Sequence, residues 1–275
     1  MDQENAVINE NIQDENDVLV DVRNVSMCYK ILVEKVDNLK EYVVKLFKRR
    51  IKYKQLWALK DISLKVKRGE SLGIIGRNGA GKSTLLKLIS GVLEPTEGEI
   101  VTKGNIVPLL KLGAGFDKNA TGRENVYLNG AMMGYSRKEM DEKMENILAF
   151  ADLGSDIDIP LKNYSSGMVS ILGFSIAVDV NPDVLIVDEV LSVGDAPFRE
   201  KCAKKIKELQ DKGCTFIIVS HEQSTIMRMC QKAVWINNNR IADYGDTKTV
   251  MENYNNFCKE HPERDNSQAK YGRHD

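Results

Sequence analysis

The sequence predicts an α/β fold in which helices flank a parallel sheet. Three short apolar runs have the pattern of buried strands, at 70–76, 183–190 and 214–221. Segments with the apolar spacing of amphipathic helices lie between them, including 82–92 and 198–213. Strands that alternate with helices usually pair in parallel, so we expect one sheet whose strands end at a common edge.

Other segments complete the predicted organisation of the chain. Residues 18–30 and 58–66 alternate between apolar and polar side chains, which predicts strands with one solvated face. The stretch between them, 31–55, is amphipathic and strongly basic, and we expect an inserted helix or an ordered loop. Helical spacing predicts a further helix over 136–153. The acidic start, 1–16, and the polar end, 259–275, are expected to be flexible tails.

Composition argues against several classes of protein. The formal net charge of −1 gives no general attraction to nucleic acid, so no nucleic-acid partner is predicted. Five cysteines without a C-x-x-C pair argue against a disulfide framework or zinc site and fit a reducing cytoplasm. The sequence has no uninterrupted apolar run of roughly 18 residues, and its start lacks the pattern of a signal peptide. The basic insert suits a solvated helix, a surface loop or contact with an anionic membrane face.

The most specific motif is "GRNGAGKST", which we call the phosphate loop. It matches G-x-x-x-x-G-K-[ST], follows an apolar strand and opens a helix. Its glycines let successive backbone N–H groups turn toward one anion, Lys82 would reach the β- and γ-phosphates, and the Ser83 hydroxyl would bind Mg²⁺. The residues predicted to bind the nucleotide here are Gly76, Arg77, Asn78, Gly79, Ala80, Gly81, Lys82, Ser83 and Thr84.

Polar side chains follow two further buried strands. Asp188 ends "VLIVD" and would hold the metal through water, and Glu189 would act as general base toward the attacking water. His221 ends "IIVSH" and would hydrogen-bond the γ-phosphate or that water. An acidic turn after a core strand and a polar strand cap are the alternatives. Lys82, Glu189 and His221 are therefore the predicted catalytic residues.

The order of the phosphate loop, "YSSGM", "DE", "SVGD" and "SH" resembles the nucleotide-binding domain of ABC ATPases, whose signature motif is usually written L-S-G-G-Q. This resemblance implies a P-loop NTPase fold over 17–258, with a RecA-like core and an N-terminal antiparallel β subdomain. It also implies a helical subdomain over about 105–165.

In that family two subunits pack head to tail, so the resemblance implies that part of each ATP site comes from a second copy of the chain. The residues implied to contact the partner's nucleotide are Ser165, Ser166, Gly167 and Asp195. A simple helix cap for Ser165 and a turn residue for Asp195 are the alternatives.

Four stretches narrow the resemblance to the ATP-binding subunits of polysaccharide exporters: "YSSGM", "LLKLGAGF", "TGRENV" and "DEVLSVGDAPFREKC". This implies an ATPase that uses ATP and Mg²⁺ and forms a homodimer on an integral-membrane permease at the cytoplasmic face of the membrane. The implied cargo is a lipid-linked polysaccharide or a teichoic-acid-like polymer. Another transport system, a non-transport ABC ATPase and a non-hydrolysing module are the alternatives.

The sequence departs from the family pattern at two places, and it offers two candidates for the aromatic residue that stacks on adenine. The family has a glutamine between its two lobes, but no glutamine lies between Gly104 and Asn125, where Lys111 or a neighbour takes its place. Ile171 follows the signature where the relatives have arginine. An N-terminal aromatic residue usually stacks on adenine; Tyr29 matches by position and Trp57 is its rival, and either would also suit the core.

Overall fold

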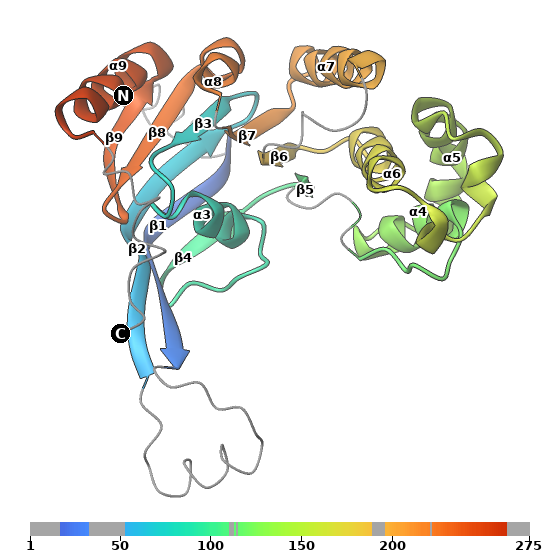
Figure 1. The fold of residues 1–275 in the computed structure, drawn as a ribbon, viewed down its shortest axis with the longest axis horizontal. Helices are drawn as coiled ribbons and strands as arrows, with labels where there is room; N and C mark the ends of the chain where they lie inside the picture. Colours follow the sequence, from blue (N-terminus) through green and yellow to red (C-terminus); the bar gives the residue numbers. More distant parts are fainter. Residues whose placement is uncertain are drawn as a thin grey trace, which may run out of the picture.

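A six-stranded sheet with the strand order β5-β6-β7-β3-β8-β9 forms the centre of the molecule (Figure 1). The computed structural model describes residues 17–32, 53–109, 113, 115–188, 196–220 and 222–262. The strands are β3 (Ser71–Ile75), β5 (Ile106–Leu109), β6 (Val184–Asp188), β7 (Thr215–Val219), β8 (Lys232–Asn237) and β9 (Arg240–Asp246). Pairing is parallel from β5 through β8 and antiparallel between β8 and β9, which confirms the predicted parallel α/β sheet.

The central strands are apolar because both faces of the sheet are covered. Successive side chains of a strand point to opposite faces. On β6, Leu185 and Val187 enter one hydrophobic core, while Val184 and Ile186 enter the other. Burial on both faces removes the polar alternation of a half-exposed strand, which is why the runs at β3, β6 and β7 are recognisable in the sequence.

A three-stranded antiparallel sheet, ordered β2-β1-β4, covers the core that Val184 and Ile186 enter. Its strands are β1 (Val18–Leu32), β2 (Tyr53–Lys67) and β4 (Glu97–Thr102). The expectation that the insert begins at residue 31 and ends at 55 is wrong at both ends, because the β1–β2 ladder continues and pairs Ile31 with Lys54. Backbone groups in this ladder are satisfied by strand pairing. Residues 33–52, 1–16 and 263–275 lie outside the described residues.

Seven helices are seen in the part of the chain that the structure describes. They are α3 (Lys82–Ile89), α4 (Gly122–Met132), α5 (Arg137–Ala151), α6 (Ser166–Asp179), α7 (Ala196–Asp211), α8 (Gln223–Met229) and α9 (Thr247–Glu260). The short 3-10 turns η1 (Gly154–Asp158) and η2 (Leu161–Asn163) connect α5 to α6. The helix predicted over 136–153 is confirmed as α5, and a capping box between Ser136 and Glu139 fixes its start.

Helices α4, α5 and α6 lie together beyond the β5 edge of the sheet and form the helical subdomain (Figure 1). Three boundaries differ from the expectation. The helical subdomain was expected to end at about residue 165, but α6 extends it to Asp179. Residues 106–109 were expected in the helical subdomain, but they form β5 and pair with β6, burying Val107 and Leu109. Helix α9 continues to Glu260, two residues into the segment that was expected to be a flexible tail.

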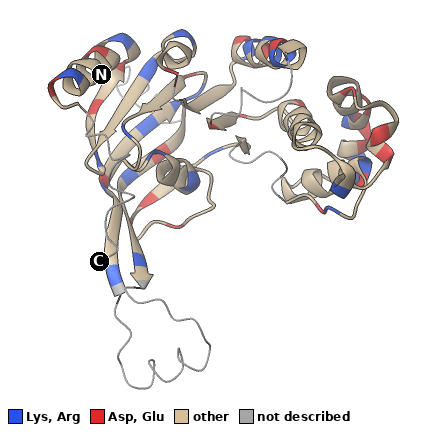
Figure 2. Ribbon diagram, in the orientation of Figure 1, with Lys and Arg blue, Asp and Glu red and all other residues tan. Residues whose placement is uncertain are grey.

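The described surface carries both signs of charge, as α7 illustrates in Figure 2. Lys204 and Lys207 each pair with an acidic residue one helical turn away on this helix. Within the described ranges, no helix has the length and apolar character needed to cross a membrane.

Candidate functional site

The phosphate loop connects β3 to α3, as the sequence predicts. Two of its glycines are required by close approach of the backbone. A Cβ on Gly76 would lie 2.3 Å from the carbonyl oxygen of Ile236, and one on Gly81 would lie 2.5 Å from the Leu59 side chain. Both have positive φ, 147° and 111°. The loop is thereby held between β2 and β8.

Lys82 is buried, and its side chain extends back to the first residues of the phosphate loop. The Nζ atom donates to the carbonyl oxygen of Gly76 at 2.7 Å and to that of Arg77 at 3.1 Å. These two bonds place a positive charge at the mouth of the loop, where an anion would lie against backbone N–H groups.

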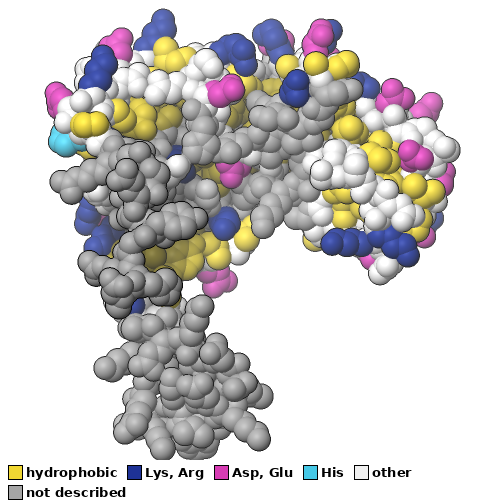
Figure 3. Space-filling view, viewed as in Figure 1, with side chains coloured by type: hydrophobic (Ala, Val, Ile, Leu, Met, Phe, Trp, Pro, Cys, Tyr) yellow, Lys and Arg dark blue, Asp and Glu magenta, His cyan; other side chains and the backbone are white. Residues whose placement is uncertain are grey.

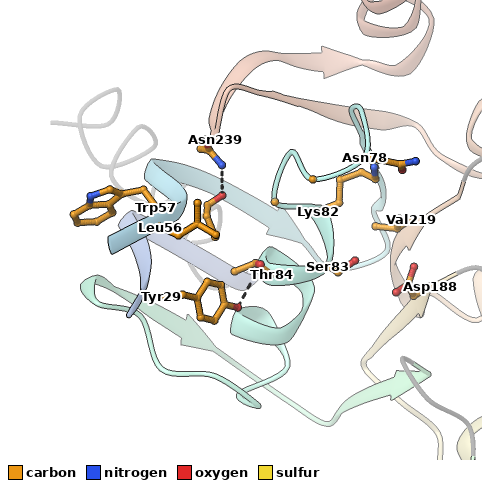
Figure 4. A pocket seen from close by; sticks show the side chains of 13 residues that line it. Tyr29, Leu56, Trp57, Asn78, Lys82, Ser83, Thr84, Asp188, Val219 and Asn239 are labelled. Carbon is orange, nitrogen blue, oxygen red and sulfur yellow. Dashed lines mark hydrogen bonds between the residues drawn. The ribbon is translucent and has the colours of Figure 1, made fainter. Parts of the chain in front are cut away.

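A cavity of about 450 Å³ opens beside the loop (Figure 4). Its walls come from β1, β2, the loop, the start of α3, the ends of β6 and β7, and the β8–β9 turn. The lining residues are Tyr29, Leu56, Trp57, Ala58, Asn78, Gly79, Gly81, Lys82, Ser83, Thr84, Asp188, Val219 and Asn239. The structure therefore brings together, in one cavity, candidate residues from four separate segments of the chain: Tyr29, Trp57, the phosphate loop and Asp188.

The donors that line the cavity fit a magnesium ion. The exposed Ser83 and the half-buried Asp188 are labelled on the same side of the cavity in Figure 4. One hydroxyl and one carboxylate suit Mg²⁺, which keeps several waters and takes further oxygen ligands from phosphates. Among the described residues, no group of three or more His, Cys, Asp and Glu side chains could hold a metal ion.

Tyr29 and Trp57 line the cavity from neighbouring strands but point in different directions. Tyr29 pairs with Leu56, and its hydroxyl lies 3.5 Å from the Thr84 Oγ1 on α3. The Trp57 indole points away from α3 in Figure 4, and the Lys60 Nζ lies 5.5 Å from its ring centroid. Tyr29 is thus the aromatic side chain nearer to the helix that follows the loop.

Three residues of the predicted loop do not line the cavity: Gly76, Arg77 and Ala80. Gly76 and the buried Ala80 shape the loop backbone. The Arg77 guanidinium is turned toward α9, where it lies 5.3 Å from the Phe257 ring centroid. The predicted binding of the nucleotide by Arg77 stays a prediction for its backbone, because its side chain does not line this cavity.

The "YSSGM" motif is at the start of α6 and does not line the cavity. Ser165 is the N-cap, and its Oγ accepts a hydrogen bond from the backbone N–H of Met168 at 3.2 Å. Ser165 and Ser166 are both exposed, and Gly167 has no side chain that would cover the helix start. The other predicted residues, Glu189, Asp195, His221 and Lys111, lie outside the described residues.

Four lining residues were missed by the sequence analysis: Leu56, Ala58, Val219 and Asn239. Asn239 Nδ2 donates to the carbonyl oxygen of Ala58 at 2.8 Å, which joins the β8–β9 turn to the cavity wall. Asn238 and Asn239 have positive φ of 47° and 66°. An asparagine pair between two strand patterns is typical of a tight hairpin turn, so the sequence held a signal for this turn, although not for its position.

Comparison with known proteins agrees with this arrangement. A family model described as ABC transporter matches residues 59–192. The O-antigen export system ATP-binding protein RfbB of Klebsiella pneumoniae is 48% identical over 204 residues, which are 74% of this chain and 83% of that protein. The teichoic acids export ATP-binding protein TagH of Levilactobacillus brevis is 42% identical over 245 residues, which are 89% of this chain and 67% of that protein.

The fold is also that of a solved ATP-binding cassette. A dimeric cassette in a post-hydrolysis state, bound to ADP and Pi, superposes with a TM-score of 0.65 at 22% identity. The match covers 83% of this chain and 98% of that one. With the phosphate loop, the cavity and the sequence relatives in agreement, the chain belongs to the ABC transporter family, as one of its ATP-binding ATPase subunits.

Proposed function

We propose that this chain hydrolyses ATP to drive export of a lipid-linked polysaccharide or teichoic-acid-like polymer across the cytoplasmic membrane. The observation that carries the ATPase part is the cavity in which Lys82, Ser83 and Asp188 meet beside the phosphate loop. The cargo follows from the similarity to an O-antigen exporter and a teichoic acid exporter.

ATP would lie in this cavity with its phosphates over the loop. The backbone N–H groups around Gly79 and Gly81 and the Lys82 ammonium supply positive charge to the phosphates. The adenine would stack on Tyr29, whose hydroxyl already lies beside Thr84 on α3. Ser83 and Asp188 would hold Mg²⁺, which neutralises charge on the phosphate oxygens when it is bound.

Glu189 would take a proton from the attacking water, because it directly follows Asp188 at the end of β6. His221 would hydrogen-bond the γ-phosphate or that water, because it follows Ser220 after β7. The ends of β6 and β7 already contribute Asp188 and Val219 to the cavity. Parallel neighbours end at the same edge of the sheet, which supports placing both residues close to the reacting phosphate.

A second copy of the chain would complete each site. Ser165, Ser166 and Gly167 begin α6 and are accessible on the helical subdomain, away from the chain's own cavity. Backbone N–H groups and the helix dipole at such a start favour an anion. Head-to-tail pairing would bring these residues, together with Asp195, to the γ-phosphate held by the partner.

The helical subdomain would bind an integral-membrane permease, and this contact would hold the ATPase at the cytoplasmic face of the membrane. A groove of about 870 Å³ runs along α4 and is lined in part by Tyr127, Leu128 and Ala131. Leu128 and Met132 are 43% and 69% exposed. Figure 3 shows apolar side chains between charged ones on this subdomain. Exposed apolar side chains beside a groove favour a protein partner.

The proposed ATP hydrolysis is tested with the full chain, in which one of two lysines of α3 is replaced by alanine. Lys82→Ala should reduce Mg²⁺-dependent phosphate release at least about 100-fold, because it removes a cation that acts on the transferred phosphate. Lys87→Ala is the matched control, since Lys87 is exposed in the last turn of the same helix. Equal activity of the two variants would contradict the proposed site.

The transport part is tested in cells. Loss of this chain should leave the finished lipid-linked polymer on the inner side of the membrane while its synthesis continues. Surface polymer at the wild-type amount would instead indicate another transport system.

A further inference from the structure

The last turn of α9 contacts the phosphate loop through Arg77. The guanidinium carbon of Arg77 lies 5.3 Å from the Phe257 ring centroid, and Arg77 Nη2 donates to the backbone carbonyl oxygen of His261. The His261 ring stacks on Phe257, with centroids 4.5 Å apart and planes 20° from parallel. A cation of the phosphate loop is therefore held by the end of a helix that begins 170 positions later in the sequence.

Helix α9 is firmly attached to the sheet. It buries Val250 and Met251 in the core, and the rings of Tyr254 and Phe257 lie 5.6 Å and 5.0 Å from the ring of Trp235 on β8. Trp235 itself is only 8% exposed. Figure 1 shows α9 packed at the β8–β9 end of the sheet. Phe257 is thus a rigid support for Arg77 and not a freely moving surface ring.

The backbone of Arg77 in turn organises the loop. Its carbonyl oxygen accepts hydrogen bonds from Lys82 Nζ at 3.1 Å and from the backbone N–H of Ala80 at 3.2 Å. The neighbouring Gly76 lies directly against the carbonyl of Ile236 on β8. Fixing the Arg77 side chain on α9 therefore fixes the carbonyl group that holds the Lys82 ammonium in place.

We propose that Arg77 is a positioning residue for nucleotide binding and that the Phe257–His261 turn of α9 is its support. Arg77 does not line the cavity, so it acts through the loop and Lys82. The end of α9 then supports nucleotide binding from outside the cavity. This inference rests on the proposed function of the cavity as the nucleotide site.

The proposal is tested by MgADP binding to the full chain, because ADP engages the loop without turnover. Arg77→Met and Phe257→Leu should each weaken binding roughly 3- to 10-fold, which is the range expected for losing a partly desolvated cation–π contact. The double variant should bind about as weakly as the weaker single variant, because both changes break the same connection. Tyr254→Leu is the matched control: it removes a ring contact with Trp235 one turn earlier and should bind MgADP as the wild type does.

Two results would overturn the proposal. If Arg77→Met weakens binding while Phe257→Leu binds like the wild type, Arg77 acts on the nucleotide without α9. If Tyr254→Leu weakens binding as much as Phe257→Leu, the effect is general loosening of the helix. A wild-type chain that does not bind MgADP would overturn the nucleotide site itself, which is a separate and recognisable failure.

A measurement on the unmodified chain decides the question even where a variant folds poorly. Linkage requires that if the α9 turn supports the loop, bound MgADP also stabilises the turn. Hydrogen exchange of the amides at 257–261 should slow when MgADP is added, while the amides at 248–250 in the first turn of α9 should exchange unchanged. Equal exchange at 257–261 with and without MgADP would overturn the proposal.

Discussion

The Lys201 ammonium on α7 donates a hydrogen bond to the carbonyl oxygen of Phe150, 2.8 Å away at the end of α5. The same Nζ lies 3.3 Å from the carbonyl oxygen of Ala149 and 4.7 Å from the Phe150 ring centroid. A lysine in this position satisfies helix-end carbonyls that have no partner within the helix. Lys201 thereby connects α5, in the helical subdomain, to α7, which begins directly after Asp195.

Lys201→Met should lower the free energy of unfolding by about 1 kcal/mol, because the methionine keeps the apolar stem but loses the donor to the α5 carbonyls. The control is Lys204→Met on the same helix. Lys204 pairs with Glu200 at 2.9 Å, and both side chains are at least 70% exposed, so the loss should stay below about 0.5 kcal/mol. Urea unfolding measures both, and equal losses would show that Lys201 does not hold α5.

Asn125 organises the loop that leads into α4. Its side chain is fully buried. The Oδ1 atom accepts a hydrogen bond from the backbone N–H of Asp117 at 2.8 Å. The Nδ2 atom donates to the carbonyl oxygen of Asp117 at 2.9 Å and to that of Thr121 at 2.8 Å. Asn125→Ala should cost about 2–3 kcal/mol of stability, because buried backbone groups lose their partner. Asn119→Ala, at an exposed position of the same loop, should cost less than about 0.5 kcal/mol. Similar unfolding midpoints for the two variants would contradict this role.

Asp183 makes part of the stability depend on pH. The backbone N–H of Asn105 and the Arg68 guanidinium each donate to its carboxylate at 2.8 Å, and these bonds lower the pKa of Asp183 below its ordinary value of 3.8. Because the folded-state pKa is depressed, this stabilisation is present above about pH 3.8 and is lost as the pH falls through the folded-state pKa.

Asp183→Ala should therefore lower the thermal midpoint at pH 7, and its difference from the wild type should shrink as the pH is lowered below 3.8. Asp211→Ala is the control, since Asp211 is 66% exposed and pairs with Lys207, which is 75% exposed. A difference between Asp183→Ala and the wild type that is independent of pH would indicate lost packing and not a lost charge.

The two aromatic residues of the cavity are expected to differ in nucleotide binding. Tyr29→Ala should weaken MgADP binding about 10-fold, the size of a lost base-stacking contact, while Tyr29→Phe should retain it. Trp57→Ala should have little effect, because the indole points away from α3. Weaker binding by Trp57→Ala than by Tyr29→Ala would assign the adenine to Trp57 instead.

Local patterns made the centre of this site predictable from the sequence. The loop from Gly76 to Thr84 combines a strand, glycines and a helix start in consecutive residues, and Asp188 ends an apolar run, so the structure places them where the sequence analysis expected.

The rest depends on contacts between distant segments. Ile31 continues β1 only because Lys54 pairs with it, β5 belongs to the sheet only because β6 lies beside it, and Arg77 faces α9 only because Phe257 reaches it. No short-range pattern encodes such pairings.

The most direct test of a nucleotide site shared between two copies of the chain is the solution mass of the Glu189→Gln variant with and without MgATP. If Glu189 is the general base, as proposed, its removal should leave ATP bound and uncleaved, so we expect a monomer without ATP and a doubled mass with it. Adding Ser165→Arg should abolish this dimer, because the larger cation would block the start of α6. A Glu189→Gln chain that binds ATP and remains monomeric would contradict the claim that two copies share each nucleotide.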